Sequence, residues 1–148
     1  MLKSLRRSSL STASKILAIL LVLSTPLAQA DLKDDVIARC RRQMGEYGAA
    51  MVKACVDQDL AAAKALAEYP QELRDIVARC QRQMENYGWS MVKACADQDI
   101  EAASALPKYP KKHESIIARC QRQMGEYGFS MVRTCVDQDI EAEESLKE

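Results

Sequence analysis

The sequence has only one histidine and seven aromatic residues in 148 positions: one Trp, one Phe and five Tyr. A Ser-His-Asp or Cys-His arrangement could form only around that single histidine, His113, so the usual hydrolytic chemistries are hard to build. No other constellation of catalytic side chains stands out. We therefore expect a protein that is not an enzyme and has no catalytic residues.

Acidic residues are missing from the first thirty positions, which contain Lys3, Arg6, Arg7 and Lys15. The other 118 residues hold 17 basic and 21 acidic side chains, a net charge of −4. The overall balance of zero therefore combines a basic leader with a mildly acidic remainder. Such a remainder argues against nucleic acid as a partner, because phosphate binding needs a basic surface.

The leader has the pattern of a secretory signal peptide over residues 1–30. A basic segment precedes an apolar run at 16–23, and the small-residue exit Ala28-Gln29-Ala30 comes directly before Asp31. The run is much shorter than the roughly 20 residues that a membrane-spanning helix needs. We expect a periplasmic or secreted mature protein that starts at Asp31, has no membrane span and lies where disulfides persist.

An exact internal period of 40 residues is the strongest signal in the sequence. Val36-Ile-Ala-Arg-Cys40 recurs as Ile76-Val-Ala-Arg-Cys80 and as Ile116-Ile-Ala-Arg-Cys120, and sixteen positions are identical in all three copies. Periods of this length are typical of stacked supersecondary units. The pattern predicts three units, at 31–75, 76–115 and 116–148, that form one domain.

The spacing within each unit predicts two helices. In the first unit, one helical series is Ile37, Cys40, Met44 and Tyr47, and the other is Val52, Cys55, Asp59, Ala62 and Leu66. Gly48 and its copies Gly88 and Gly128 are expected to end the first helix, and Ser90 and Ser130 to cap the second. The predicted fold class is all-α, with three tandem antiparallel helical hairpins and about six helices.

Two arrangements of the hairpins fit the pattern, a right-angled stack and a compact six-helix bundle. Tyr69-Pro70 and Tyr109-Pro110 mark the junctions, since proline suits the first turn of the following helix. The repeats resemble tetratricopeptide-like helical repeats in general form. They lack that class's Trp-x-x-Leu-Gly-x-x-Tyr pattern and its period of 34 residues, so the resemblance implies no function.

The cysteines are arranged symmetrically about each turn. Cys40 lies seven residues before Tyr47 and Cys55 seven residues after Gly48, so an antiparallel hairpin places them at one level. Six cysteines allow 15 pairings. The symmetric spacing selects Cys40 with Cys55, Cys80 with Cys95, and Cys120 with Cys135, one disulfide in each hairpin.

A soft-metal site is the alternative reading of the same positions. If the thiols were reduced, each hairpin could offer Cu(I) two thiolates and two thioethers. The candidate ligand sets are Cys40, Met44, Met51 and Cys55; Cys80, Met84, Met91 and Cys95; and Cys120, Met124, Met131 and Cys135. We favour disulfides with core methionines, no metal and no cofactor, because of the oxidising compartment. Copper remains the alternative cofactor.

Two aspartates of the second helix call for a structural or a functional explanation. Asp59 falls on the inward face, where an acid needs a partner, and an arginine such as Arg39 suits that role. Asp57 with Asp59 could instead provide oxygen ligands for a hard cation, but the match to a calcium loop is weak. We expect ion pairing at Asp59 and its copies.

The copies differ where Trp89 and Phe129 replace Ala49, and an aromatic residue found only in some copies could mark a contact surface. The leading hypothesis is a helical-repeat scaffold that binds a protein or peptide partner, with its binding residues unknown. Neither the identity of the partner nor the oligomeric state follows from the sequence.

Overall fold

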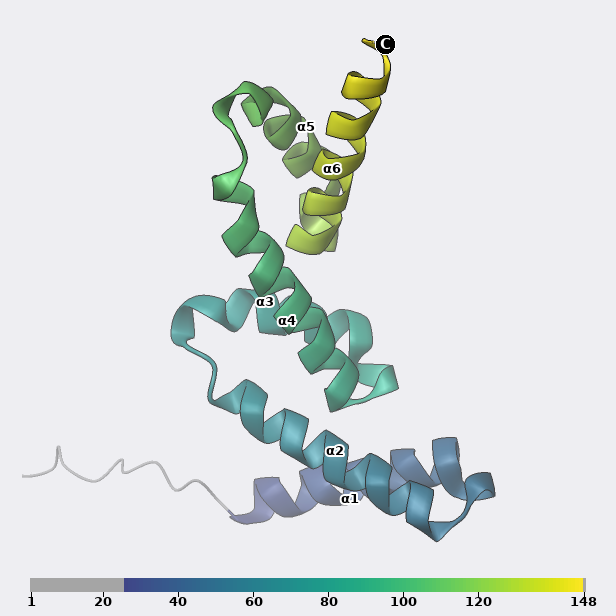
Figure 1. Cartoon of the computed structure of the whole chain (residues 1–148). Coiled ribbons are helices and arrows are strands. Elements are labelled where there is room, and N and C mark those ends of the chain that lie inside the picture. The colour runs from purple at the N-terminus through teal and green to yellow at the C-terminus, as the bar shows by residue number, and fades with distance from the viewer. Residues whose placement is uncertain (1–25, 148) are drawn as a thin grey trace, which may run out of the picture.

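The computed structural model describes residues 26–147, and helices and short 3₁₀ turns account for nearly all of these residues (Figure 1). The helices are α1 (Pro26–Met44), α2 (Ala49–Ala67), α3 (Arg74–Met84), α4 (Trp89–Ala105), α5 (Glu114–Met124) and α6 (Phe129–Ser145). No strand occurs within these residues. The predicted all-α class with six helices in three hairpins is confirmed.

Each hairpin turns through a 3₁₀ segment and a glycine. In the first unit α1 ends at Met44, Gly45–Tyr47 forms the 3₁₀ turn, and Gly48 follows with φ of 95°. Gly88 and Gly128 also have positive φ, in a region that is open to little besides glycine. The prediction that the chain breaks at these glycines agrees with their positions, because each follows the 3₁₀ turn that continues the first helix and directly precedes the second helix.

The predicted serine caps are wrong. Helix α4 begins at Trp89, one residue before Ser90, and α6 begins at Phe129, one residue before Ser130. Gly88 and Gly128 occupy the N-cap positions and have no side chain to accept a hydrogen bond. An aspartate of the preceding unit instead accepts hydrogen bonds from backbone N–H groups at the start of each helix: Trp89 and Ser90 in α4, and Ser130 in α6.

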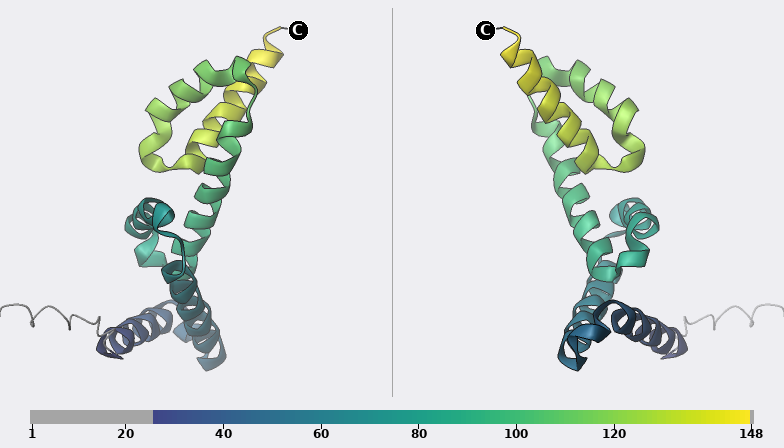
Figure 2. Two further views of the ribbon diagram at one scale, coloured as in Figure 1. Left: turned by 90° about the vertical axis from the view of Figure 1, so that its left-hand side faces the viewer. Right: turned by 90° about the vertical axis from the view of Figure 1, so that its right-hand side faces the viewer.

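The hairpins form an open stack and not the compact six-helix bundle that the sequence pattern also allows. Helix α2 packs on α4, and α4 packs on α6, so the second helices make a continuous column. Both side views show the first helices α1, α3 and α5 on one side of this column (Figure 2). The stack therefore depends on contacts between neighbouring units only.

Each core cluster combines residues of two units. Leu66, near the end of α2, packs with Ile76, Cys80, Val92 and Ala96 of the second unit. The equivalent cluster of the third unit contains Leu106 of α4 with Ile116, Cys120, Val132 and Val136. A single hairpin could not bury these side chains alone, so each unit stabilises the next.

Proline begins the linkers rather than the α-helices. Pro70 precedes the 3₁₀ turn Gln71–Leu73 and Pro110 precedes Lys111–His113, so α3 and α5 start a few residues later than predicted. Residues 1–25 of the predicted signal peptide lie outside the described residues, and α1 starts at Pro26. None of the described helices combines the length and apolar character needed to cross a membrane.

Candidate functional site

A disulfide closes each hairpin between its two helices. The bonded pairs are Cys40–Cys55, Cys80–Cys95 and Cys120–Cys135, with Cα atoms 5.8, 5.7 and 5.7 Å apart. The first cysteine of every pair is fully buried. Three such bonds are typical of a protein in an oxidising environment. Each bond also holds together the two helices that flank a hairpin turn.

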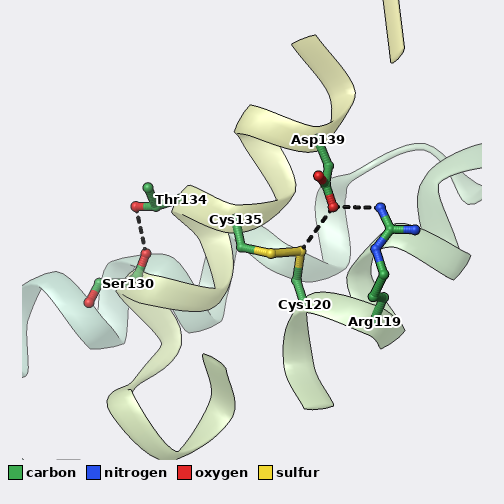
Figure 3. Close-up of a disulfide and its surroundings, with 6 residues drawn as sticks. All are labelled: Arg119, Cys120, Ser130, Thr134, Cys135 and Asp139. Carbon is green, nitrogen blue, oxygen red and sulfur yellow. Dashed lines mark hydrogen bonds and ion pairs between the residues drawn. A yellow bond between two sulfur atoms is a disulfide. The ribbon is translucent and has the colours of Figure 1, made fainter. Parts of the chain in front are cut away.

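The third disulfide lies beside an acidic group (Figure 3). Asp139 of α6 points toward the bridge, with its Oδ2 atom 3.6 Å from Sγ of Cys120 and 2.5 Å from the guanidinium of Arg119. Cys120, Cys135 and Asp139 place three potential ligand atoms within 4.8 Å of one another. Because the two sulfur atoms are bonded to each other and Arg119 occupies the carboxylate, this cluster poorly fits a cation.

The joint between the first two units is built around Asp59. Its buried carboxylate pairs with Arg39 of its own unit and accepts hydrogen bonds from the backbone N–H groups of Trp89 and Ser90. These N–H groups carry the positive end of the α4 dipole, which favours a carboxylate. A Cβ atom on Gly88 would lie 2.7 Å from Oδ2 of Asp59, so glycine is also needed for space.

The second joint repeats this arrangement. Asp99 pairs with Arg79 and accepts a hydrogen bond from Ser130 N at 2.9 Å, while Gly128 packs against its carboxylate. The Arg79 guanidinium also lies over the ring of Phe129, 5.8 Å from its centroid. The aromatic residue that distinguishes the third copy from the first therefore packs at the joint, in contact with both core clusters.

Burial lowers the pKa of the joint arginines. For Arg39 the largest cause is desolvation, and the nearby positive charge of Arg42 lowers the pKa further. Arg79 is affected in the same way by burial and by Arg82. Arginine stays charged despite such shifts. Each joint therefore contains an ion pair, Arg39–Asp59 or Arg79–Asp99, in which each buried charge is neutralised by the other.

A tyrosine of each linker forms a second polar contact across the joint. Tyr69 donates a hydrogen bond to Asp97, which also accepts one from Lys93 at 2.6 Å. Tyr109 donates equivalently to Asp137. Burial, followed by the aspartate contact, raises the pKa of both tyrosines. Tyr69 and Tyr109 therefore lie at the junctions that they mark in the sequence, where they also pack against the two core clusters.

The two aspartates of the alternative hard-cation site, Asp57 and Asp59, have separate partners. Asp59 is buried at the joint and pairs with Arg39, whereas Asp57 is exposed and pairs with Lys53 on the same helix. The prediction of an arginine partner for Asp59 agrees with the ion pair to Arg39. Sequence reasoning missed the second role of Asp59, the capping of a helix in the next unit, because that contact joins residues 30 and 31 positions apart.

Tyrosine and methionine side chains form an exposed apolar series at the hairpin turns. This turn row consists of Tyr47, Met51, Tyr87, Met91, Tyr127 and Met131, which are between 44 % and 65 % exposed. Among the residues described, Leu146 is the one other large hydrophobic side chain with comparable exposure. The turns follow one another along the stack (Figure 1), so the row repeats once per unit.

The turn row corrects one sequence expectation. Met51, Met91 and Met131 were expected in the core, but their side chains face solvent. The valine that follows the methionine faces the packed side of the helix instead, and Val92 and Val132 are fully buried. Met44, Met84 and Met124 are half-buried, as core methionines can be. The four proposed copper ligands of a hairpin therefore comprise two bonded cysteines, one half-buried methionine and one exposed methionine.

Two shallow hollows lie on the column of second helices at the joints. The α2–α4 hollow measures about 470 Å³ and is lined by Gln58, Ala62, Ser90, Lys93 and Asp97 among others. The α4–α6 hollow, of about 280 Å³, uses the positions 40 residues later, including Gln98, Ala102, Ser130, Arg133 and Asp137. The period of the sequence thus reappears as a hollow repeated at each joint.

Comparison with protein-family models, with curated proteins and with solved structures yields no match to this chain.

Proposed function

We propose that this chain is a non-enzymatic scaffold that binds a protein or peptide partner in the periplasm or outside the cell. The turn row is the observation that carries the proposal. Tyr and Met are enriched in protein interfaces, and methionine adapts its shape to different partners. Apolar side chains of this size that are exposed at the same place in every unit favour a binding surface.

The rest of each unit supports such a surface. The disulfide holds the two helices seven or eight residues from the turn, and the Asp59 and Asp99 joints hold consecutive turns in a fixed relation. A preorganised surface loses less conformational entropy when a partner binds. A partner that spans several units would gain further from the repetition, because its later contacts become intramolecular.

A pull-down from periplasmic extract tests the proposal. The bait is the exported protein, and the test variant replaces all six residues of the turn row with Ala. The matched control replaces Gln58, Gln98 and Gln138, which are exposed on the second helices and identical in the three copies. Circular dichroism establishes that both variants retain the helical content of the wild type.

We expect a partner that the wild type and the glutamine variant retain and the turn-row variant loses. The captured protein, once purified, should bind the wild type directly and bind the turn-row variant at least about tenfold more weakly, which corresponds to about 1.4 kcal/mol. Loss of the partner from the glutamine variant alone would place the binding site at the joint hollows instead of the turn row. Equal capture by all three baits, or capture by none, would overturn the proposal.

Copper binding has less structural support as a second function. It requires open disulfides, because a bonded sulfur is not a thiolate, and it requires the exposed Met51, Met91 and Met131 to turn inward. The proposed scaffold function requires neither open disulfides nor inward-facing methionines.

A further inference from the structure

The last unit presents an unused copy of the surface that joins one unit to the next. The side chains of Asp59 and Asp99 are 4 % and 2 % exposed, whereas that of Asp139 is 36 % exposed. Leu66 is 4 % exposed, but its equivalent Leu146 is 86 % exposed. The α6 end thus carries both the capping acid and the apolar residue of a joint, and no other described unit covers them.

The first unit presents the complementary surface. Gly88 and Gly128 are buried against an aspartate, while Gly48 is exposed and a Cβ placed on it would contact nothing within 4 Å. Val92 and Val132 are fully buried, yet Val52 is only half-buried. A groove of about 510 Å³ opens here, lined by Ile37, Arg41, Gly45, Ala49, Val52, Lys53 and Val56.

We propose that the α6 end of one copy docks into this first-unit groove of a second copy and repeats the internal joint between two molecules. Asp139 would accept hydrogen bonds from the free N–H groups at the start of α2, as Asp59 and Asp99 do for α4 and α6. Leu146 would enter the groove beside Val52, as Leu66 does beside Val92.

Charge complementarity supports a second copy as the occupant. At the joint between the second and third units, Arg133 pairs with Glu101 at 3.1 Å. The positions equivalent to these two residues at the free ends are Lys53 in the groove and Glu141 on α6, which are again oppositely charged. The end of α6 is acidic, with Glu141, Glu143 and Glu144 exposed, whereas Arg41 and Lys53 line the groove.

The two surfaces differ from each other, so the contact is heterologous and does not close on itself as a twofold dimer would. Each added molecule leaves one groove and one α6 end free, and the stack continues. The contact lacks the aromatic residue that Trp89 and Phe129 provide in the internal joints, because Ala49 stands at that position. It should therefore be weaker than an internal joint and depend on protein concentration.

Sedimentation velocity over a concentration series tests this inference on the protein produced from the whole sequence and purified from a bacterial periplasm. The wild type should form elongated dimers and larger species as the concentration rises to about 1 mM, the range of a weak contact of about 4 kcal/mol. Leu146→Ser should weaken association about tenfold, because it removes a side chain that becomes buried. Leu146 is exposed in the single chain, so its replacement should leave thermal unfolding unchanged.

A charge exchange separates the proposed contact from general attraction. Lys53→Glu and Glu141→Lys should each weaken self-association, because each variant alone brings like charges together at the contact. An equimolar mixture of the two variants should recover association, because the α6 end of each variant then meets an oppositely charged groove on the other. Glu46→Lys, a change at an exposed position in the first turn, is the control and should associate like the wild type. A wild type that stays monomeric at every concentration, a closed dimer, or association unaffected by Leu146→Ser would overturn the inference.

Discussion

The carboxylate of Asp59 accepts a hydrogen bond from the backbone N–H of Ser90 at 3.0 Å, across 31 residues of sequence. The same carboxylate is paired with Arg39 in its own hairpin. One buried acid therefore neutralises an arginine and caps a helix of the next unit. The relation between neighbouring hairpins is set by a polar contact as well as by the leucine and valine side chains around it.

Replacing Asp59 or Asp99 with Asn should destabilise the stack by about 3 kcal/mol, because the change leaves a buried arginine without its counter-charge. The same replacement at Asp139 should cost less than about 1 kcal/mol, since the Arg119–Asp139 pair is partly solvated. Urea unfolding followed by circular dichroism measures all three. Equal losses at the three positions would mean that the aspartates act within their own hairpins and not at the joints.

The turn glycines should respond differently to substitution. Gly48→Ala introduces strain at positive φ, with a cost of about 1–3 kcal/mol. Gly88→Ala adds a Cβ atom 2.7 Å from Asp59 Oδ2 and should cost at least about 1 kcal/mol more, as overpacking does. Gly45→Ala, in open space without positive φ, is the control and should be nearly neutral. Thermal unfolding of the three variants compares them, and equal losses at Gly48 and Gly88 would remove the joint from the explanation.

The hairpins could be predicted from the sequence because their determinants are local. The spacing of Cys40 and Cys55 about the turn and the helical series of apolar residues both lie within one unit. The joints could not be predicted in the same way. The Asp59 contact with Ser90 depends on how two hairpins stack, and the period alone does not distinguish a stack from a bundle.

The turn row escaped prediction for a related reason. Met51 continues the helical series of a cysteine-bearing face, and that spacing places it with the core residues. The 3₁₀ segment at Gly45–Tyr47 and the positive φ of Gly48 shift the start of α2. Met51 lies in the first turn of α2, where the neighbouring valine position faces the packed side, and its own side chain is exposed.

Removing one disulfide should lower the free energy of unfolding by about 3 kcal/mol, because each closes a loop of 15 residues in the unfolded chain. The double variant Cys80→Ala/Cys95→Ala tests the middle hairpin, and Cys40→Ala/Cys55→Ala is its counterpart at one end. Urea unfolding measures the loss in each.

Mass spectrometry of the exported protein checks the state of the sulfur atoms independently. An alkylating reagent should add nothing before reduction and should label six cysteines after it. Six free thiols together with bound copper would favour the soft-metal alternative and contradict the disulfide-stabilised scaffold.

The linker tyrosines should make the stack sensitive to alkaline pH. Burial, and then the contact with Asp97 or Asp137, raises the pKa of Tyr69 and Tyr109, so the fold favours the neutral phenol. This contribution to stability is complete below the ordinary tyrosine pKa of about 10 and is lost as the pH rises through the higher pKa of the folded state. The variant Tyr69→Phe/Tyr109→Phe should therefore lose less stability than the wild type between about pH 9 and 12.

Thermal unfolding at stepwise pH, with tyrosinate absorbance followed in parallel, measures the effect. Tyr47→Phe, which changes a phenol outside the joints, should keep the wild-type profile, and an unchanged profile in the double variant would show that the joints do not depend on these two protons.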